Sequence, residues 1–151
     1  FLNKLYGEYG IAFDLTITTP GLFSLKDLFD LSLELDVHTL IKTTFAFESS
    51  IMMCPQVLPR ELFNEVIDDV LDYIKPKIEA NPKFGYWITC LEDLKNRQVF
   101  SEKYPDWREG LKSGKERLAK VDKFRRNEGV LNKIYLENNK KVYDWWNSNL
   151  I

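Results

Sequence analysis

The chain has 151 residues, of which 44% are hydrophobic and 29% are charged. This length and composition are typical of one globular domain and exclude collagenous, disordered and coiled-coil proteins. The 21 basic and 23 acidic residues give a formal net charge of -2. That balance argues against nucleic acid as a partner, because phosphate binding needs clustered positive charge. No apolar run approaches the roughly 20 residues of a membrane-spanning helix, so we expect no membrane partner.

The chain contains two cysteines, Cys54 and Cys90, and one histidine, His38. A zinc or iron–sulfur site needs about four soft ligands, usually with one closely spaced pair, so we predict no metal site in this chain. Two reduced thiols are typical of a cytoplasmic protein. His38 begins a predicted buried strand without any Gly-x-Ser-x-Gly motif. We therefore expect the imidazole of His38 to have a structural role and not a catalytic one. A small hydrolase, with His38 as its base, ranks third among the functional hypotheses.

The first third of the chain predicts a strand, a helix and a second strand. Ile11 to Thr19 and Val37 to Phe47 each alternate apolar with polar residues, which is the periodicity of a β-strand. Between them, apolar residues at helical spacing predict a helix from Leu25 to Leu35. This order predicts a βαβ unit with parallel strands. Two strands alone are not stable in water, so they need further strands or a cover of helices.

The remainder of the chain is predicted to be helical. A helix begins near Pro59 and ends at Pro76, and further helices cover about Tyr86 to Val99 and Asp106 to Arg126. The outer face of the first helix carries four acidic residues, which are Glu65, Asp68, Asp69 and Asp72. A metal site is one interpretation of this run, but a solvated face is favoured because no converging ligands accompany it.

Polar residues within the two predicted strands are the candidates for a functional site. In an α/β barrel, alternate strand residues point inward and chemistry collects at the carboxyl ends of the strands. Thr18 ends the first strand, and Lys42 and Thr44 lie toward the end of the second. A lysine within a strand needs a partner, an anionic ligand or water for its ammonium group. Thr18, Lys42 and Thr44 are therefore predicted to face substrate or cofactor, unless this face of the sheet is solvent-exposed.

Strings of residues spread over most of the chain carry a resemblance to a known family. They are Phe13 to Lys26, Asp30 to Leu35, Lys42 to Phe47, Leu58 to Glu61, Ile67 to Asp69, Tyr73 to Pro76 and Trp145-Trp146. These strings are similar to a group of radical S-adenosylmethionine proteins from phages and marine bacteria that carry a twitch-type C-terminal part. The resemblance implies that the two strands are late strands of a partial β/α barrel, with the helix between them outside.

The resemblance also implies that this chain is the C-terminal portion of a longer protein. The family's Cys-x-x-x-Cys-x-x-Cys loop holds a [4Fe–4S] cluster that cleaves S-adenosylmethionine, and it would lie upstream, because neither Cys54 nor Cys90 matches it. The expected fold is α/β, with a βαβ segment at 1–58 and a helical extension at 59–151 packed on it as one structural domain. Alone, such a segment is expected to bind neither the [4Fe–4S] cluster nor S-adenosylmethionine and to be inactive. Its expected partners are the missing N-terminal part of the same protein and a peptide or small-molecule substrate.

An alternative function is a stand-alone protein-interaction domain of phage or bacterial origin. Near the end of the chain, Trp145 and Trp146 point in different directions on a predicted helix. At least one ring is expected to dock on the body of the domain and anchor the C-terminal helix. The other interpretation is that the pair forms a patch for a protein partner.

Overall fold

The computed structural model describes residues 12–43, 48–126 and 129–148. The described part is mostly helical and contains one sheet of two parallel strands, β1 (Ala12–Ile17) and β2 (His38–Thr43). Ala12 lies opposite His38, and Ile17 lies opposite Thr43. Helix α2 (Leu25–Leu35) connects the two strands. The predicted βαβ unit is therefore confirmed, although Ile11 and the predicted strand residues 44–47 lie outside the described residues.

The predicted first strand is too long at its carboxyl end. The chain leaves β1 after Ile17 and enters the 3-10 helix η1 (Pro20–Ser24), which leads directly into α2. Pro20 lies in the first turn of η1, where its missing N–H and fixed φ are well accommodated. The backbone N–H of Thr19 donates to the carbonyl of Met53 at 2.9 Å, so the chain beyond β1 is held by a loop from later in the sequence.

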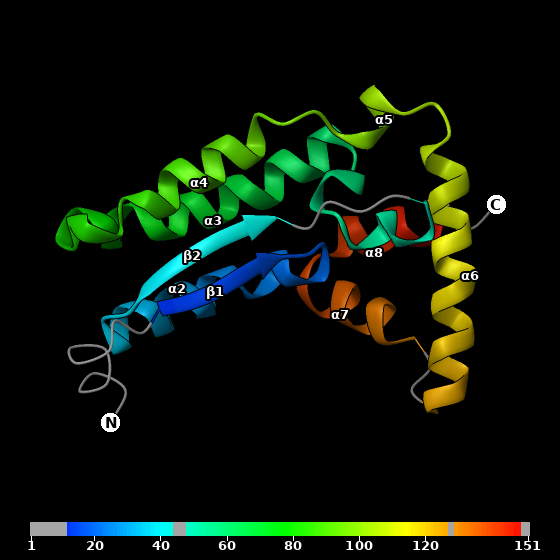
Figure 1. The fold of residues 1–151 in the computed structure, drawn as a ribbon, viewed down its shortest axis with the longest axis horizontal. Coiled ribbons are helices and arrows are strands. Elements are labelled where there is room, and N and C mark those ends of the chain that lie inside the picture. Colours follow the sequence, from blue (N-terminus) through cyan, green and yellow to red (C-terminus); the bar gives the residue numbers. More distant parts are fainter. Residues whose placement is uncertain (1–11, 44–47, 127–128, 149–151) are drawn as a thin grey trace.

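One face of the sheet is covered and the other is open. On the covered face, Ile17 and Thr39 are buried and their neighbours are half-buried. On the opposite face every described strand residue is exposed, namely Ala12, Asp14, Thr16, His38, Leu40 and Lys42. Figure 1 shows the same arrangement, with α2 behind the two strands and no described element in front of them. We refer to these six residues as the open face.

Helix α4 (Tyr86–Lys95) holds β2 through a small polar cluster. The backbone N–H of Thr39 donates to the Tyr86 hydroxyl at 2.8 Å, and the Trp87 indole N–H donates to the same oxygen at 3.1 Å. The hydroxyl groups of Thr39 and Ser32 are 2.8 Å apart, and Ser32 also donates to the carbonyl of Leu28 at 2.8 Å. Tyr86 thus satisfies a backbone donor of β2 that no neighbouring strand satisfies.

The long helix α3 (Arg60–Ala80) supplies much of the hydrophobic core. Its buried residues recur at helical spacing and are Phe63, Val66, Ile67, Val70, Leu71, Ile74 and Ile78. The prediction that Pro76 ends this helix is wrong, because α3 continues for four residues beyond it. A proline within a helix removes one backbone hydrogen bond, but here burial of Ile78 after Pro76 favours the last turn.

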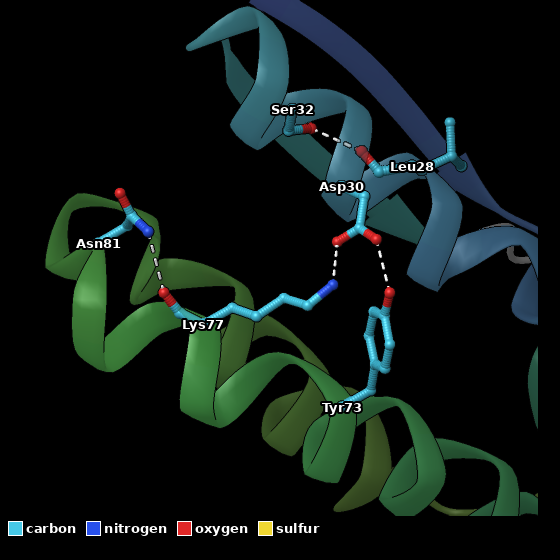
Figure 2. Close-up of polar contacts among 6 residues, drawn as sticks. All are labelled: Leu28, Asp30, Ser32, Tyr73, Lys77 and Asn81. Carbon is cyan, nitrogen blue, oxygen red and sulfur yellow. Dashed lines mark hydrogen bonds and ion pairs between the residues drawn. The ribbon is translucent and has the colours of Figure 1, made fainter.

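A polar cluster joins α2 to α3 on the side away from the sheet, as Figure 2 shows. The Asp30 carboxylate accepts hydrogen bonds from the Tyr73 hydroxyl and the Lys77 ammonium, both at 2.5 Å. The Lys77 ammonium also lies 3.8 Å from the centre of the Tyr73 ring. Partial burial alone would raise the pKa of Asp30, but the hydrogen bonds from Lys77 and Tyr73 outweigh it and hold the pKa below its usual value. The cluster therefore favours the ionised carboxylate.

Most of the remaining helices lie in the right half of the molecule in Figure 1. They are η2 (Glu48–Met53), η3 (Pro55–Val57), α5 (Phe100–Lys103), α6 (Trp107–Arg125), α7 (Val130–Asn138) and α8 (Lys140–Ser148). The short helix η4 (Pro82–Phe84) joins α3 to α4 at the opposite end. Helix α6 packs against η2, and α7 packs against η1. The predicted helix from Tyr86 to Val99 is too long, because α4 ends at Lys95 and Val99 is buried in extended backbone before α5.

The prediction that a tryptophan anchors the C-terminal helix is confirmed. Trp146 is buried and packs edge-on against Tyr135 of α7, with ring centres 5.4 Å apart. Tyr135 in turn packs against Phe23 of η1 at 5.8 Å. These ring contacts tie α8 through α7 to the segment that follows β1.

Candidate functional site

Lys42, one of the predicted site residues, lies on the open face beside a carboxylate that the sequence analysis did not single out. The Lys42 ammonium donates to the Asp14 carboxylate at 2.6 Å. The two side chains are 58% and 59% exposed, so the pair contributes little to folding stability. In the register of the sheet Lys42 is opposite Thr16, two residues from Asp14 on the same face. That two-residue spacing is the signal that identifies Asp14 as a neighbour of Lys42.

Thr18, the second predicted site residue, forms part of the turn that follows β1. Its hydroxyl oxygen accepts a hydrogen bond from the Gly21 N–H at 3.1 Å. A side chain at Gly21 would place its Cβ 2.9 Å from the same oxygen, so this tight turn favours glycine. The Thr18 side chain is half-buried and already has one polar partner. Thr44, the third predicted residue, lies outside the described residues.

A basic residue from the loop after α4 reaches the carboxyl end of β2. The Arg97 guanidinium donates to the Thr43 hydroxyl at the last position of the strand. Arg97 also borders a cavity of about 240 Å³ that Gln56, Phe100 and Lys103 help to line. Gln56 is buried, and its side-chain oxygen has no hydrogen-bond partner among the described residues. Sequence reasoning missed this cavity because its residues come from two separate short helices, η3 and α5, and from the segment after α4, and they form no motif.

The acidic run on α3 forms ion pairs with lysines of neighbouring elements. Lys26 of α2 contacts Asp69 at 2.8 Å, Lys95 of α4 contacts Asp68 at 2.6 Å, and Lys141 of α8 contacts Glu65 at 2.7 Å. Within residues 12–43, 48–126 and 129–148, no group of three or more His, Cys, Asp or Glu side chains is placed to hold a metal ion. Three of the four acidic residues of this run thus contact other helices of the domain.

The two cysteines lie in different environments. Cys54 is buried and Cys90 is half-buried, and neither forms a disulfide. Burial, followed by the nearby Asp93 carboxylate, raises the pKa of the Cys90 thiol. A thiol with a raised pKa is a poor nucleophile and a poor metal ligand at neutral pH.

The chain was compared with models of known families, with curated proteins and with solved structures, and no match was found in any of the three comparisons. In the part of the chain that the structure describes, no helix combines the length and the apolar character needed to cross a bilayer.

Proposed function

We propose that this chain is the C-terminal part of a radical S-adenosylmethionine-like enzyme, with β1 and β2 as late strands of a partial β/α barrel. The observation that carries the proposal is the open face of a parallel two-stranded sheet. Parallel sheets are normally covered on both faces, yet here only one face is covered by described residues. On the open face even Leu40 is 49% exposed. Strands and side chains of a missing N-terminal part would complete this sheet.

The position of α2 supports this orientation of the sheet. In a β/α barrel the helices lie outside and the opposite faces of the strands point into the barrel. Because α2 contacts the covered face through Ser32 and Thr39, the open face with Asp14 and Lys42 would point inward. Arg97 lies at the carboxyl end of β2, which is the end where barrel enzymes bind their substrates. Lys42 is therefore our candidate for substrate contact, whereas Arg97 bonds to Thr43, whose side chain lies on the covered face of the sheet.

The cofactors of this proposal have to be held elsewhere. The described residues supply no set of ligands for a [4Fe–4S] cluster, and the raised pKa of Cys90 disfavours the thiolate that a cluster needs. The cluster and S-adenosylmethionine would bind mainly to the missing N-terminal part. The segment described by the structure would then close the barrel and contact the substrate, and would be inactive alone.

The test of this proposal starts from the reading frame upstream of Phe1. We expect it to encode a Cys-x-x-x-Cys-x-x-Cys loop, and we expect the complete protein to bind iron and sulfide under anaerobic conditions. With a reductant, it should convert S-adenosylmethionine to methionine and deoxyadenosine. Lys42→Met should lower this rate about tenfold or more with unchanged iron content, whereas Lys75→Met, on the exposed side of α3, should change neither. A complete protein that takes up no iron would contradict the proposal.

A second candidate, a protein-interaction domain, is favoured by one exposed aromatic side chain. Phe124, in the last turn of α6, is 90% exposed, and Val121 beside it on the helix is also exposed. Trp146, by contrast, is buried and is not available to a partner. A protein that binds the chain and the Leu40→Ser variant, but not Phe124→Ser, would support this second function. Equal binding by both variants would count against it.

A further inference from the structure

A cavity of about 350 Å³ lies between α6, α7 and α8, apart from the two strands. Its lining is mainly apolar and includes Leu118, Ala119, Leu131 and the ring of Trp146. Cavities that bind small molecules are typically apolar with a few polar groups, and this volume is near the lower end of their range. The size therefore suits a small ligand.

The main polar group of this cavity is a buried lysine. Lys115 of α6 is only 6% exposed, and its ammonium donates to the backbone carbonyl of Trp146. The same ammonium lies 4.3 Å from the centre of the Trp146 ring. It forms no ion pair with any described carboxylate, although an ammonium has three N–H donors. A buried charge without a counter-ion is unfavourable, so an anion in the cavity would relieve this cost.

The charged residues around the cavity leave a net positive charge, which favours an anionic ligand. Leu118 and Asp122 lie three and seven positions after Lys115, on the same face of α6. Asp122 therefore lines the cavity two turns away from Lys115. Lys123 also borders the cavity, which leaves one excess positive charge. Asn132 of α7 lines it as well, and its buried side-chain oxygen lacks a hydrogen-bond partner among the described residues. This oxygen is an acceptor, so it would pair with a donor group of a ligand and not with a carboxylate.

We propose that this cavity binds a small monocarboxylate, whose carboxylate pairs with Lys115 and whose apolar body packs against Leu118, Leu131 and Trp146. One ammonium in an apolar lining fits a single carboxylate. A phosphate group is usually held by several donors, such as guanidinium or clustered backbone N–H groups. This site is independent of the open face and of the function proposed above.

The test uses the whole chain and three probes, namely benzoate, phenylacetate and octanoate, with titration calorimetry as the readout. We expect at least one of them to bind, and its neutral amide to bind about tenfold or more weakly, which corresponds to about 1.4 kcal/mol. Lys115→Met should weaken binding of the acid about tenfold, whereas Lys120→Met, an exposed position of the same helix, should leave it unchanged.

Two outcomes would overturn this inference. One is the absence of binding by all three acids at millimolar concentration, and the other is equal affinity for an acid and its amide. Because Lys115→Met changes a buried position, its thermal unfolding is measured first. A Lys115→Arg variant serves as a second test, since it keeps the charge and should retain most of the affinity for the acid.

Discussion

The strand pair and the helix pair α3–α4 are built on the same principle, yet they differ in how completely they are covered. Both show the periodicity that places apolar residues on one side. The helices bury that side within the described chain, with Phe63, Trp87 and Leu91 fully buried. The strands bury one face and leave Leu40 and Lys42 of the other exposed. The apolar side of the helices lies in the core, whereas one face of the strand pair is left uncovered by the described residues, which is the basis of our proposal that the sheet continues in another part of the protein.

The largest expected difference between the two regions comes from one substitution made in each. Leu91→Ala in α4 removes a fully buried side chain and should lower the free energy of unfolding by about 2–5 kcal/mol. Leu40→Ala on the open face should change it by no more than about 0.5 kcal/mol. Chemical denaturation measures both. Similar losses for the two variants would mean that the open face is covered in the chain itself.

Tyr86 joins the two regions, and its hydroxyl should matter more than that of an ordinary tyrosine. Tyr86→Phe leaves the backbone N–H of Thr39 and the indole N–H of Trp87 without their acceptor. We expect a loss of roughly 2 kcal/mol, because unsatisfied buried donors are costly. Tyr143→Phe is the control, since no hydrogen bond of its hydroxyl occurs among the described residues. Faster amide exchange in β2 of Tyr86→Phe would show that this contact holds the strand.

The buried ammonium of Lys115 extends the comparison to α6. Burial lowers the pKa of Lys115 to about 8, while the unfolded value is about 10.4. At a pH between these two pKa values the unfolded state binds more protons than the folded state, so the free energy of unfolding should rise with pH. Lys115→Met should abolish this rise and stabilise the protein by about 1–2 kcal/mol at pH 7. Denaturation at pH 7, 8 and 9 measures both effects, and an unchanged slope would contradict the assignment.

The smallest expected effect is at the polar cluster between α2 and α3. The pKa of Asp30 is lowered in the folded state. The ionised carboxylate therefore contributes fully to the free energy of unfolding above about pH 4, and this contribution is lost as the pH falls through the lowered pKa. Asp30→Asn should therefore destabilise the protein at pH 7 by at most about 1 kcal/mol, since solvent screens this half-exposed cluster. The difference from wild type should vanish near pH 2. A difference that persists at that pH would assign the effect to packing.

Periodicity predicted those parts of the fold that depend on one local pattern. The bounds of α2 agree with the predicted helix, and the alternation in both strands is confirmed. His38, expected to begin a buried strand, is exposed instead, because the face that it shares with Leu40 is the open one. Pro76 and the segment after Lys95 were predicted wrongly. In both places burial of a nearby side chain, Ile78 or Val99, decides the backbone path, and local sequence does not encode that burial.

The candidate site was less predictable than the fold. Lys42 was singled out because a strand lysine is unusual, but its partner Asp14 follows only from the register of the two strands. Arg97 and Lys115 have no sequence motif. Arg97 bonds to Thr43, which is distant in sequence, and the buried Lys115 contacts Trp146 of α8. Tertiary packing creates both environments.

The most direct test of our proposal that another part of the protein completes the sheet is the reactivity of Lys42 toward an amine-labelling reagent, with Lys75 as an exposed internal reference. The rates are compared between this chain and the product of the complete reading frame. We predict that Lys42 reacts at a rate similar to Lys75 in the chain alone and about tenfold or more slowly in the complete protein, because the added strands and barrel interior shield it. Unchanged reactivity of Lys42 in the complete protein would contradict the account.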